Sequence, residues 1–334
     1  MAFGATIIDA DGLRLRADEK ALFREVDPFG FILFARNIDT PEQVHALCSE
    51  MREAVGREAI ITIDQEGGRV QRMRAPTWRE WAPPLDFVAI AGAQAPRAMY
   101  LMYRIIAAEL RDAGVDSNCA PMVDVAGAQT HEFLRNRCYS SDPMRVAELG
   151  RAAAQGMLAG GVLPIVKHIP GHGRATMDSH FDLPRVGAAL EDLRAVDFAP
   201  FKALSDLPMG MTAHLVYDAL DDAPATLSPK VMQVIREDIG FDNLIMTDDI
   251  SMKALSGSMV ENATGSLAAG CDVVLLCNAT LEDRRAVAEA AGTMTDAAQI
   301  RAERALGMRK TPDDVDIPAL ERELEALLGG AVHG

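Results

Sequence analysis

No apolar stretch of the sequence approaches the ~20 residues that a helix needs to cross a bilayer. The N-terminus, MAFGATIIDADG, also lacks the basic segment and long apolar segment of a secretory signal. These absences argue against a membrane-spanning protein and against a secreted one. We therefore expect a soluble cytoplasmic protein that has no membrane partner.

Cysteine is scarce, with five residues in a chain of 334. The five are odd in number and scattered, and no two have the spacing of a zinc site. Disulfide pairing and a cysteine-based metal site are therefore disfavoured. We expect buried free thiols in a reducing compartment, at Cys48, Cys119, Cys138, Cys271 and Cys277.

Basic residues are also in deficit, because Lys plus Arg number 33 and Asp plus Glu number 49, which gives a formal net charge of −16. A field of this sign repels nucleic acid and anionic lipid, so neither is expected as a partner. It is still compatible with a small anionic substrate held by a few local arginines and lysines.

Short, continuous apolar runs recur along the chain and alternate with amphipathic helical patterns, two of which begin at the plausible N-caps Asp142 and Ser228. Continuous apolarity is typical of parallel strands that are covered on both faces. The pattern predicts an α/β protein with a single (β/α)8 TIM-type barrel as its catalytic domain, over residues 1–334. A doubly wound open sheet is the alternative. The runs are 4–9, 30–36, 59–66, 119–125, 163–168, 209–214, 243–249 and 272–278.

The C-terminal region is expected to be helical near 281–308 and 317–328, and the tail 329–334 is expected to be mobile. No linker that would divide the chain into two domains is visible.

Polar residues stand where most of these runs end. The carboxyl ends of the strands of a barrel meet on one face, which is where barrel enzymes keep their active sites. The pattern therefore indicates a site on that face, built from Arg36, Asp64–Glu66, Asp124, Lys167–His168, His214, Asp248–Asp249 and Asn278.

The segment KHIPGHGRATMDSH, residues 167–180, could hold a metal, a phosphate or an acid/base pair. His168 and His172 are four residues apart, but the intervening proline and glycine argue against the helix that would place both on one face. The order of Lys167 and the glycines does not fit a P-loop either. In Asp178-x-His180, a carboxylate can orient an imidazole that gives and takes protons near neutral pH.

Carboxylates elsewhere could complete such a site. Asp248 and Asp249 follow a strand directly, and at least one should reach the barrel mouth as a nucleophile or base, although Asp249 could instead cap the next helix. In IDQEGGRVQR, Asp64 could accept paired hydrogen bonds from sugar hydroxyls. Arg69 or Arg72 could either lock that carboxylate or grip a substrate acid.

The segments IDQEGGRVQR, CAPMVDV, KHIPGHG with DSH, MTAHLVY and TDDISM occur in an order that resembles glycoside hydrolase family 3. The resemblance is closest to the bacterial β-N-acetylhexosaminidases of the NagZ type and runs from about residue 5 to about residue 280. It implies a retaining mechanism with Asp248 as nucleophile and His180, paired with Asp178, as acid/base. The substrate-binding residues that it implies are Asp64, Arg72, Arg137, Lys167 and His168.

The resemblance further implies removal of N-acetylglucosamine from 1,6-anhydro-muropeptides, with or without peptide, during cell-wall recycling. No cofactor and no metal are expected, since side chains and water suffice for both steps, and a monomer is expected. One alternative is a phosphorylase in which phosphate replaces water as the acceptor. Another is a sugar-binding barrel without catalysis.

Overall fold

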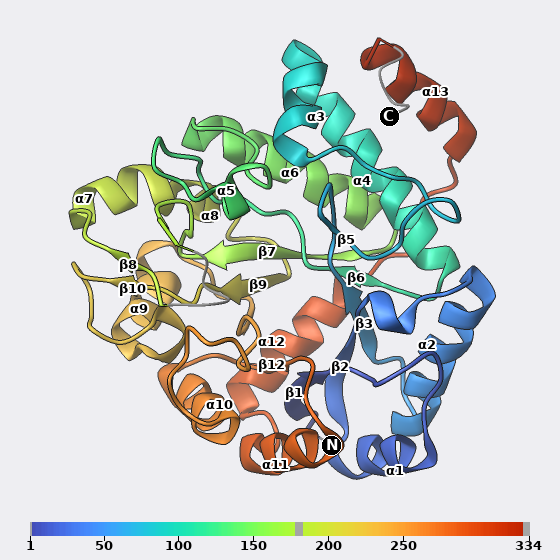
Figure 1. The fold of residues 1–334 in the computed structure, drawn as a ribbon, viewed down its shortest axis with the longest axis vertical. Coiled ribbons are helices and arrows are strands. Elements are labelled where there is room, and N and C mark those ends of the chain that lie inside the picture. The colour runs from blue at the N-terminus through green and yellow to red at the C-terminus, as the bar shows by residue number, and fades with distance from the viewer. Residues whose placement is uncertain (1, 178–182, 330–334) are drawn as a thin grey trace.

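The computed structural model describes residues 2–177 and 183–329, and Figure 1 shows strands at the centre surrounded by helices. The strands form two four-stranded sheets in which every neighbouring pair is parallel. The first sheet has the order β12 (Val274–Leu276), β1 (Gly4–Ile8), β2 (Pro28–Leu33), β3 (Ile60–Ile63). The second has the order β11 (Leu244–Met246), β9 (Met209–Thr212), β7 (Leu163–Ile169), β6 (Ser117–Asn118).

Backbone hydrogen bonds also connect the edge strands of the two sheets. Between β3 and β6, the amide of Asp116 donates to Ile61 O at 3.1 Å and that of Cys119 to Ile63 O at 2.8 Å. Between β11 and β12, the amide of Thr247 donates to Val273 O at 3.1 Å. Both edges of each sheet therefore have hydrogen-bonded neighbours.

Successive strand residues enter two different apolar clusters. In β11, Leu244 and Met246 lie in an inner cluster, while Ile245 lies in the larger cluster that the strands share with the helices. Side chains alternate across a strand, so both faces of these sheets are buried. This explains why the strands are continuously apolar in sequence.

The helices begin and end near the expected places. The two expected N-caps are confirmed, because Asp142 accepts from Met144 N at 2.9 Å and Ser228 from Val231 N at 3.1 Å. The helices are α1 (Ala17–Val26), α2 (Pro41–Val55), α3 (Pro84–Ala91), α4 (Ala95–Asp112), α5 (Glu132–Arg135), α6 (Pro143–Ala159), α7 (Leu190–Asp192), α8 (Ala199–Ala203), α9 (Pro229–Gln233), α10 (Met259–Ala269), α11 (Leu281–Ala291), α12 (Asp296–Gly307) and α13 (Ile317–Leu327).

Two expectations were wrong in detail. The run 119–125 is not a regular strand, because β6 ends at Asn118 and Pro121 has no amide hydrogen to donate to a ladder. The segment 281–308 is not one helix, because Gly292 has a φ of 62° and ends α11 before α12 begins.

Small elements that the apolar pattern did not indicate lie beside the main sheets. A hairpin joins β4 (Gln65–Gly67) to β5 (Val70–Gln71), and β8 (Arg185–Val186) pairs with β10 (Val216–Tyr217). All five cysteines are buried and free, as expected. Within the described ranges, no helix has both the length and the apolarity to span a membrane.

Candidate active site

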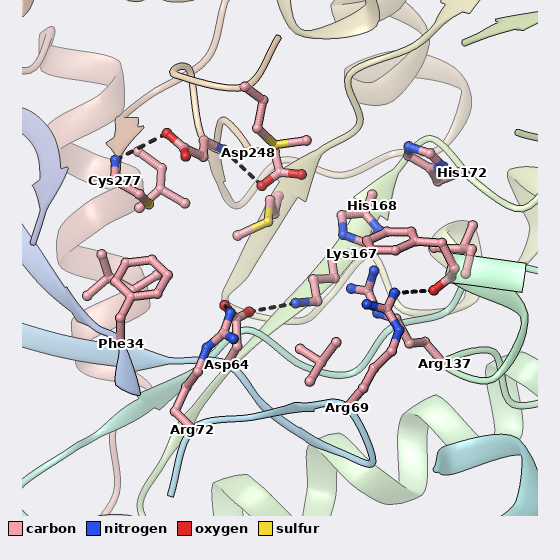
Figure 2. Close-up of a pocket in the computed structure, with 18 of the residues that line it drawn as sticks. Phe34, Asp64, Arg69, Arg72, Arg137, Lys167, His168, His172, Asp248 and Cys277 are labelled. Atoms are coloured by element: carbon pink, nitrogen blue, oxygen red, sulfur yellow. Dashed lines mark hydrogen bonds and ion pairs between the residues drawn. The ribbon is translucent and has the colours of Figure 1, made fainter. Parts of the chain in front are cut away.

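A cavity of about 370 Å³ opens where the main strands end. The described residues expected as nucleophile or as substrate-binding residues all line it, although they come from segments far apart in the chain. Of the other strand-end candidates, Asp249 and Asn278 line the cavity, and Arg36, Glu66, Asp124 and His214 do not. Figure 2 shows Asp248 on one side of the cavity and Asp64 with Arg72 on the other. The lining candidates are Asp64, Arg72, Arg137, Lys167, His168 and Asp248. Asp178 and His180 lie outside the described residues.

A buried ion network forms one wall of the cavity. Lys167 Nζ lies 2.9 Å from Asp64 Oδ1 and 2.6 Å from Glu66 Oε1. Asp64 Oδ2 accepts from Arg72 at 2.9 Å, and Glu66 accepts a bidentate pair from Arg137 at 2.8 and 2.9 Å. The network therefore links three basic side chains through two carboxylates.

The network keeps its members charged. Burial acts to raise the pKa of Asp64, but Lys167 and Arg72 hold it well below its ordinary value. Burial likewise opposes ionisation of Glu66, yet Arg137 and Lys167 lower its pKa to about 2. Burial acts to lower the pKa of Lys167, and the two carboxylates raise it above its ordinary value. A polar ligand would therefore meet fixed charges here.

The hairpin β4–β5 turns the chain back so that Arg72 lies beside Asp64. Its turn uses Gly67 and Gly68, whose φ angles of 107° and 57° are unfavourable for residues with a side chain. Gln65 Oε1 accepts from the amides of Arg72 and Met73 at 3.0 and 3.1 Å. This arrangement explains the sequence IDQEGGRVQR, in which two residues eight positions apart form one ion pair.

His168 is held from behind by a carboxylate. Its Nδ1 lies 2.7 Å from Asp124 Oδ2, and Asp124 Oδ1 accepts from the amide of His172 at 2.6 Å. Asp124 thereby fixes the imidazole of His168 and the start of the glycine-containing loop. Burial lowers the pKa of His172 to about 4, and its buried Nδ1 has no hydrogen-bond partner among residues 2–177 and 183–329.

Asp248 follows β11 directly and is half-buried at the cavity wall. Its Oδ1 accepts from the amide of Asp249 at 2.8 Å. Burial acts to raise the pKa of Asp248, but attraction to the imidazoles of His214 and His168 and the hydrogen bond from Asp249 more than offset it. The pKa of Asp248 therefore lies below its ordinary value, which favours the anionic carboxylate at neutral pH.

The alternative prediction that Asp249 caps the next helix was wrong. Its Oδ1 accepts from the amides of Ser251 and Cys277 at 3.0 and 3.1 Å, while α10 is capped by Ser258. Burial raises the pKa of Asp249 to about 6. Asp249 therefore organises the loop that carries Asp248.

Two aromatic residues, Phe34 and Phe133, also line the cavity, and no sequence pattern indicated either of them. Phe34 ends an apolar run, and its ring lies 5.4 Å from the guanidinium carbon of Arg72. Phe133 stands in a loop without a motif, and the guanidinium of Arg69 stacks over it at 3.7 Å. Glu66 and Asp124 were visible as polar strand ends, but their supporting contacts depend on the fold.

Two bacterial β-hexosaminidases and one solved structure of NagZ are similar to this chain over most of its length. A β-hexosaminidase of Alkalilimnicola ehrlichii is 37% identical over 286 residues, which cover 83% of this chain and 82% of the relative. One of Methylococcus capsulatus is 39% identical over 279 residues, covering 81% and 82%. The structure of NagZ from Neisseria gonorrhoeae in complex with N-trifluoroacetyl-D-glucosamine has a TM-score of 0.86, with 31% identity and 99% coverage of both chains.

The model of the glycosyl hydrolase family 3 N-terminal domain matches residues 7–306, which extends beyond the expected end near 280. The cavity with its carboxylates lies inside this range. The chain therefore belongs to glycoside hydrolase family 3 and is a glycoside hydrolase that groups with the β-hexosaminidases of that family.

Proposed function

We propose that the protein is a retaining β-N-acetylglucosaminidase that removes terminal N-acetylglucosamine from 1,6-anhydro-muropeptides during cytoplasmic cell-wall recycling. One observation carries the proposal: the carboxylate of Asp248, whose pKa lies below its ordinary value, faces across one cavity the wall of charged side chains formed by Asp64, Arg72 and Lys167. The gonococcal relative with N-trifluoroacetyl-D-glucosamine supports a 2-acylamino sugar as the ligand.

The proposed scaffold is one closed (β/α)8 domain that acts as a monomer. The hydrogen bonds from Cys119 to Ile63 and from Thr247 to Val273 support closure, because they connect the two sheets at both edges. In a closed barrel the two sheets are one, and the catalytic residues reach a common mouth.

In the first step, a carboxylate oxygen of Asp248 bonds to the anomeric carbon while the bond to the aglycone oxygen breaks. His180, oriented by Asp178, donates its proton to that oxygen. In the second step, His180 takes a proton from water, the water oxygen bonds to the anomeric carbon, and Asp248 departs. Two inversions leave the sugar in its original β configuration.

The cavity wall has the donors and acceptors that a sugar needs. Each oxygen of Asp64 already accepts from a basic side chain and still has a lone pair for a ring hydroxyl. Arg137 uses only part of its guanidinium for Glu66, so its other N–H groups can serve the substrate. His168 and Lys167 contribute donors from β7.

Phosphorolysis is the second candidate function. A neutral or cationic His180 repels phosphate less than a carboxylate acid/base would. Cationic side chains from Arg72, Arg137 and Lys167 also line the cavity. In this reaction phosphate oxygen, instead of water, would bond to the anomeric carbon in the second step.

Product analysis tests the substrate and separates these acceptors. We expect N-acetylglucosamine from the disaccharide N-acetylglucosaminyl-β-1,4-1,6-anhydro-N-acetylmuramic acid, with the β anomer appearing first by ¹H NMR. The product should be the same in phosphate-free and phosphate-rich buffer. Sugar 1-phosphate would establish the phosphorylase instead, and initial release of the α anomer in water would refute retention.

Substitution of His180 tests the proposed acid. His180→Ala should slow the first step far more for glycosides with poor leaving groups than for activated aryl glycosides, because the latter need little protonation. The measurement is the single-turnover rate of aglycone release. Equal losses for both substrates would argue against His180 as the acid.

A further inference from the structure

His214 is a buried histidine that the proposed reaction does not use. It follows β9, is 0% exposed, and makes hydrogen bonds through both ring nitrogens. Nδ1 lies 2.7 Å from Thr226 Oγ1, and Nε2 lies 2.9 Å from the main-chain oxygen of Asp249. Because a carbonyl oxygen only accepts, Nε2 carries the proton in this contact.

Asp249 connects this imidazole to the nucleophile. Its amide donates to Asp248 Oδ1 at 2.8 Å, and its own carboxylate accepts from the amide of Cys277, beyond β12, at 3.1 Å. Asp249 is therefore held from β9 by His214 and from the β12 side by Cys277. Its position determines where its amide points, and so how the carboxylate of Asp248 is oriented.

The other side of the imidazole is fixed as well. Thr226 Oγ1 also lies 2.8 Å from Thr212 Oγ1 and 3.2 Å from the main-chain oxygen of Ala213. If Thr226 donates to Ala213, Nδ1 must donate to Thr226. If Thr226 donates to Nδ1 instead, the ring is neutral. In both arrangements Nε2 still donates to Asp249, so the contact is independent of the charge on the ring.

We propose that His214 is a positioning residue for the glycosidase reaction, which orients the carboxylate of Asp248 by donating a hydrogen bond to the carbonyl of Asp249. The inference rests on the proposed role of Asp248 as nucleophile. It gives His214, the last residue of the MTAH segment, a role that the two proposed reaction steps do not include. In the cationic form, this imidazole also attracts Asp248 and so favours the ionised carboxylate.

Two substitutions separate the hydrogen bond from the packing. His214→Phe fills the space but has no donor, whereas His214→Gln places an amide nitrogen near the position of Nε2. With an activated aryl β-N-acetylglucosaminide, we expect His214→Phe to lower kcat by about ten- to a hundredfold, since small displacements of reacting groups have effects of this size. KM should change little, and His214→Gln should recover most of the loss.

Ser117→Ala is the matched control, because Ser117 is buried on β6 and its hydroxyl donates to a carbonyl, that of Leu163, at 3.1 Å. This variant should lower the melting temperature without lowering kcat. Should His214→Phe fail to fold, Thr226→Val removes the support behind the imidazole and should also lower kcat at unchanged KM. An unchanged kcat in the folded variant, His214→Phe or Thr226→Val, would overturn the proposal. So would a loss of kcat that His214→Gln does not restore.

Covalent labelling distinguishes a failure of this inference from a failure of the nucleophile assignment. A fluorinated glycoside that traps the glycosyl-enzyme should label wild-type Asp248, and should do so more slowly in His214→Phe. Labelling of Asp248 at the wild-type rate in that variant would contradict only the role of His214. Labelling of a different residue would contradict the role of Asp248 as well.

Discussion

At the residue scale, Lys167 is a buried cation that two carboxylates stabilise. Its side chain is 3% exposed and touches two carboxylates, Asp64 and Glu66. Taking charges out of water is costly, and that cost is offset only when each charge has a partner. The lysine is therefore part of the folded structure as well as a candidate ligand for the sugar.

Lys167→Met keeps the unbranched apolar stem of the side chain but removes its ammonium group. Because both carboxylates would then keep only their arginine partners, we expect a loss of about 3 kcal/mol in the free energy of unfolding. Urea unfolding at pH 7 measures this loss. Lys202→Met, at an exposed position of α8, is the control and should change the value by less than about 0.5 kcal/mol. A Lys167→Met variant as stable as wild type would contradict this view of the network.

The sequence was informative for residues whose place in the cavity wall follows from strand position. Asp64, Lys167 and Asp248 could be predicted because carboxyl ends of parallel strands meet on one face. The partner of Arg137 could not be predicted, because Glu66 is far from it in sequence and their contact depends on the segment that follows α5. Phe133 could not be predicted either, since a single aromatic residue in a loop has no periodic pattern.

At the scale of elements, the half-buried carboxyl of Glu109 in α4 lies against the loop before α3. Glu109 Oε1 accepts from the amide of Arg79 at 3.3 Å, and its buried Oε2 has no hydrogen-bond partner in the part of the chain that the structure describes. Arg79 in turn pairs with Glu321 of α13 at 2.6 Å. Burial raises the pKa of Glu109 to about 7.

This pKa makes stability depend on pH. The folded protein binds the proton of Glu109 more tightly than the unfolded chain does. Its contribution to stability is therefore complete below the ordinary pKa and is lost as the pH rises towards about 7. Glu109→Gln cannot ionise. Between pH 5 and pH 8, the stability of this variant relative to wild type should rise by about 1–3 kcal/mol.

Urea unfolding at the two pH values measures the difference. Glu42→Gln, at an exposed position in the first turn of α2, provides the control. A Glu109→Gln variant whose relative stability does not change with pH would show that the carboxyl ionises as easily in the folded state as in the unfolded one.

Elements were predictable where the apolar pattern was strong, and less so where backbone chemistry interrupts it. The strand expected over 119–125 contains Pro121, which removes a donor, and regular pairing ends at Asn118. The hairpin β4–β5 is formed by Gly67, Gly68 and the side chain of Gln65, so it has no apolar pattern to indicate it.

At the scale of the whole molecule, two apolar clusters hold the strands together. The inner cluster is closed at one end by α12, through Ala298, Ala302 and Ala305. The larger cluster extends between strands and helices and includes Leu324 of α13. Small alanines allow α12 to approach the strand ends closely. This packing would give a closed barrel a dry interior below the catalytic mouth.

Hydrogen exchange tests the proposed closure. The amides of Cys119 and Thr247, which donate between the two sheets, should exchange as slowly as an amide that donates inside one sheet, such as that of Leu163 in β7, which donates to Asp116 O beside β6 at 2.9 Å. Exchange would be followed residue by residue by NMR or by fragment mass spectrometry. Much faster exchange at both junctions would mean that the sheets open as separate units.

The central claim is that Asp248 attacks the anomeric carbon, and trapping the glycosyl-enzyme tests it most directly. A fluorinated β-glycoside that slows the second step would be incubated with the enzyme, and the labelled peptide would be identified by mass spectrometry after digestion. We expect one sugar on Asp248 and no label in Asp248→Asn. A sugar attached to another residue, or labelling that persists in Asp248→Asn, would contradict the account.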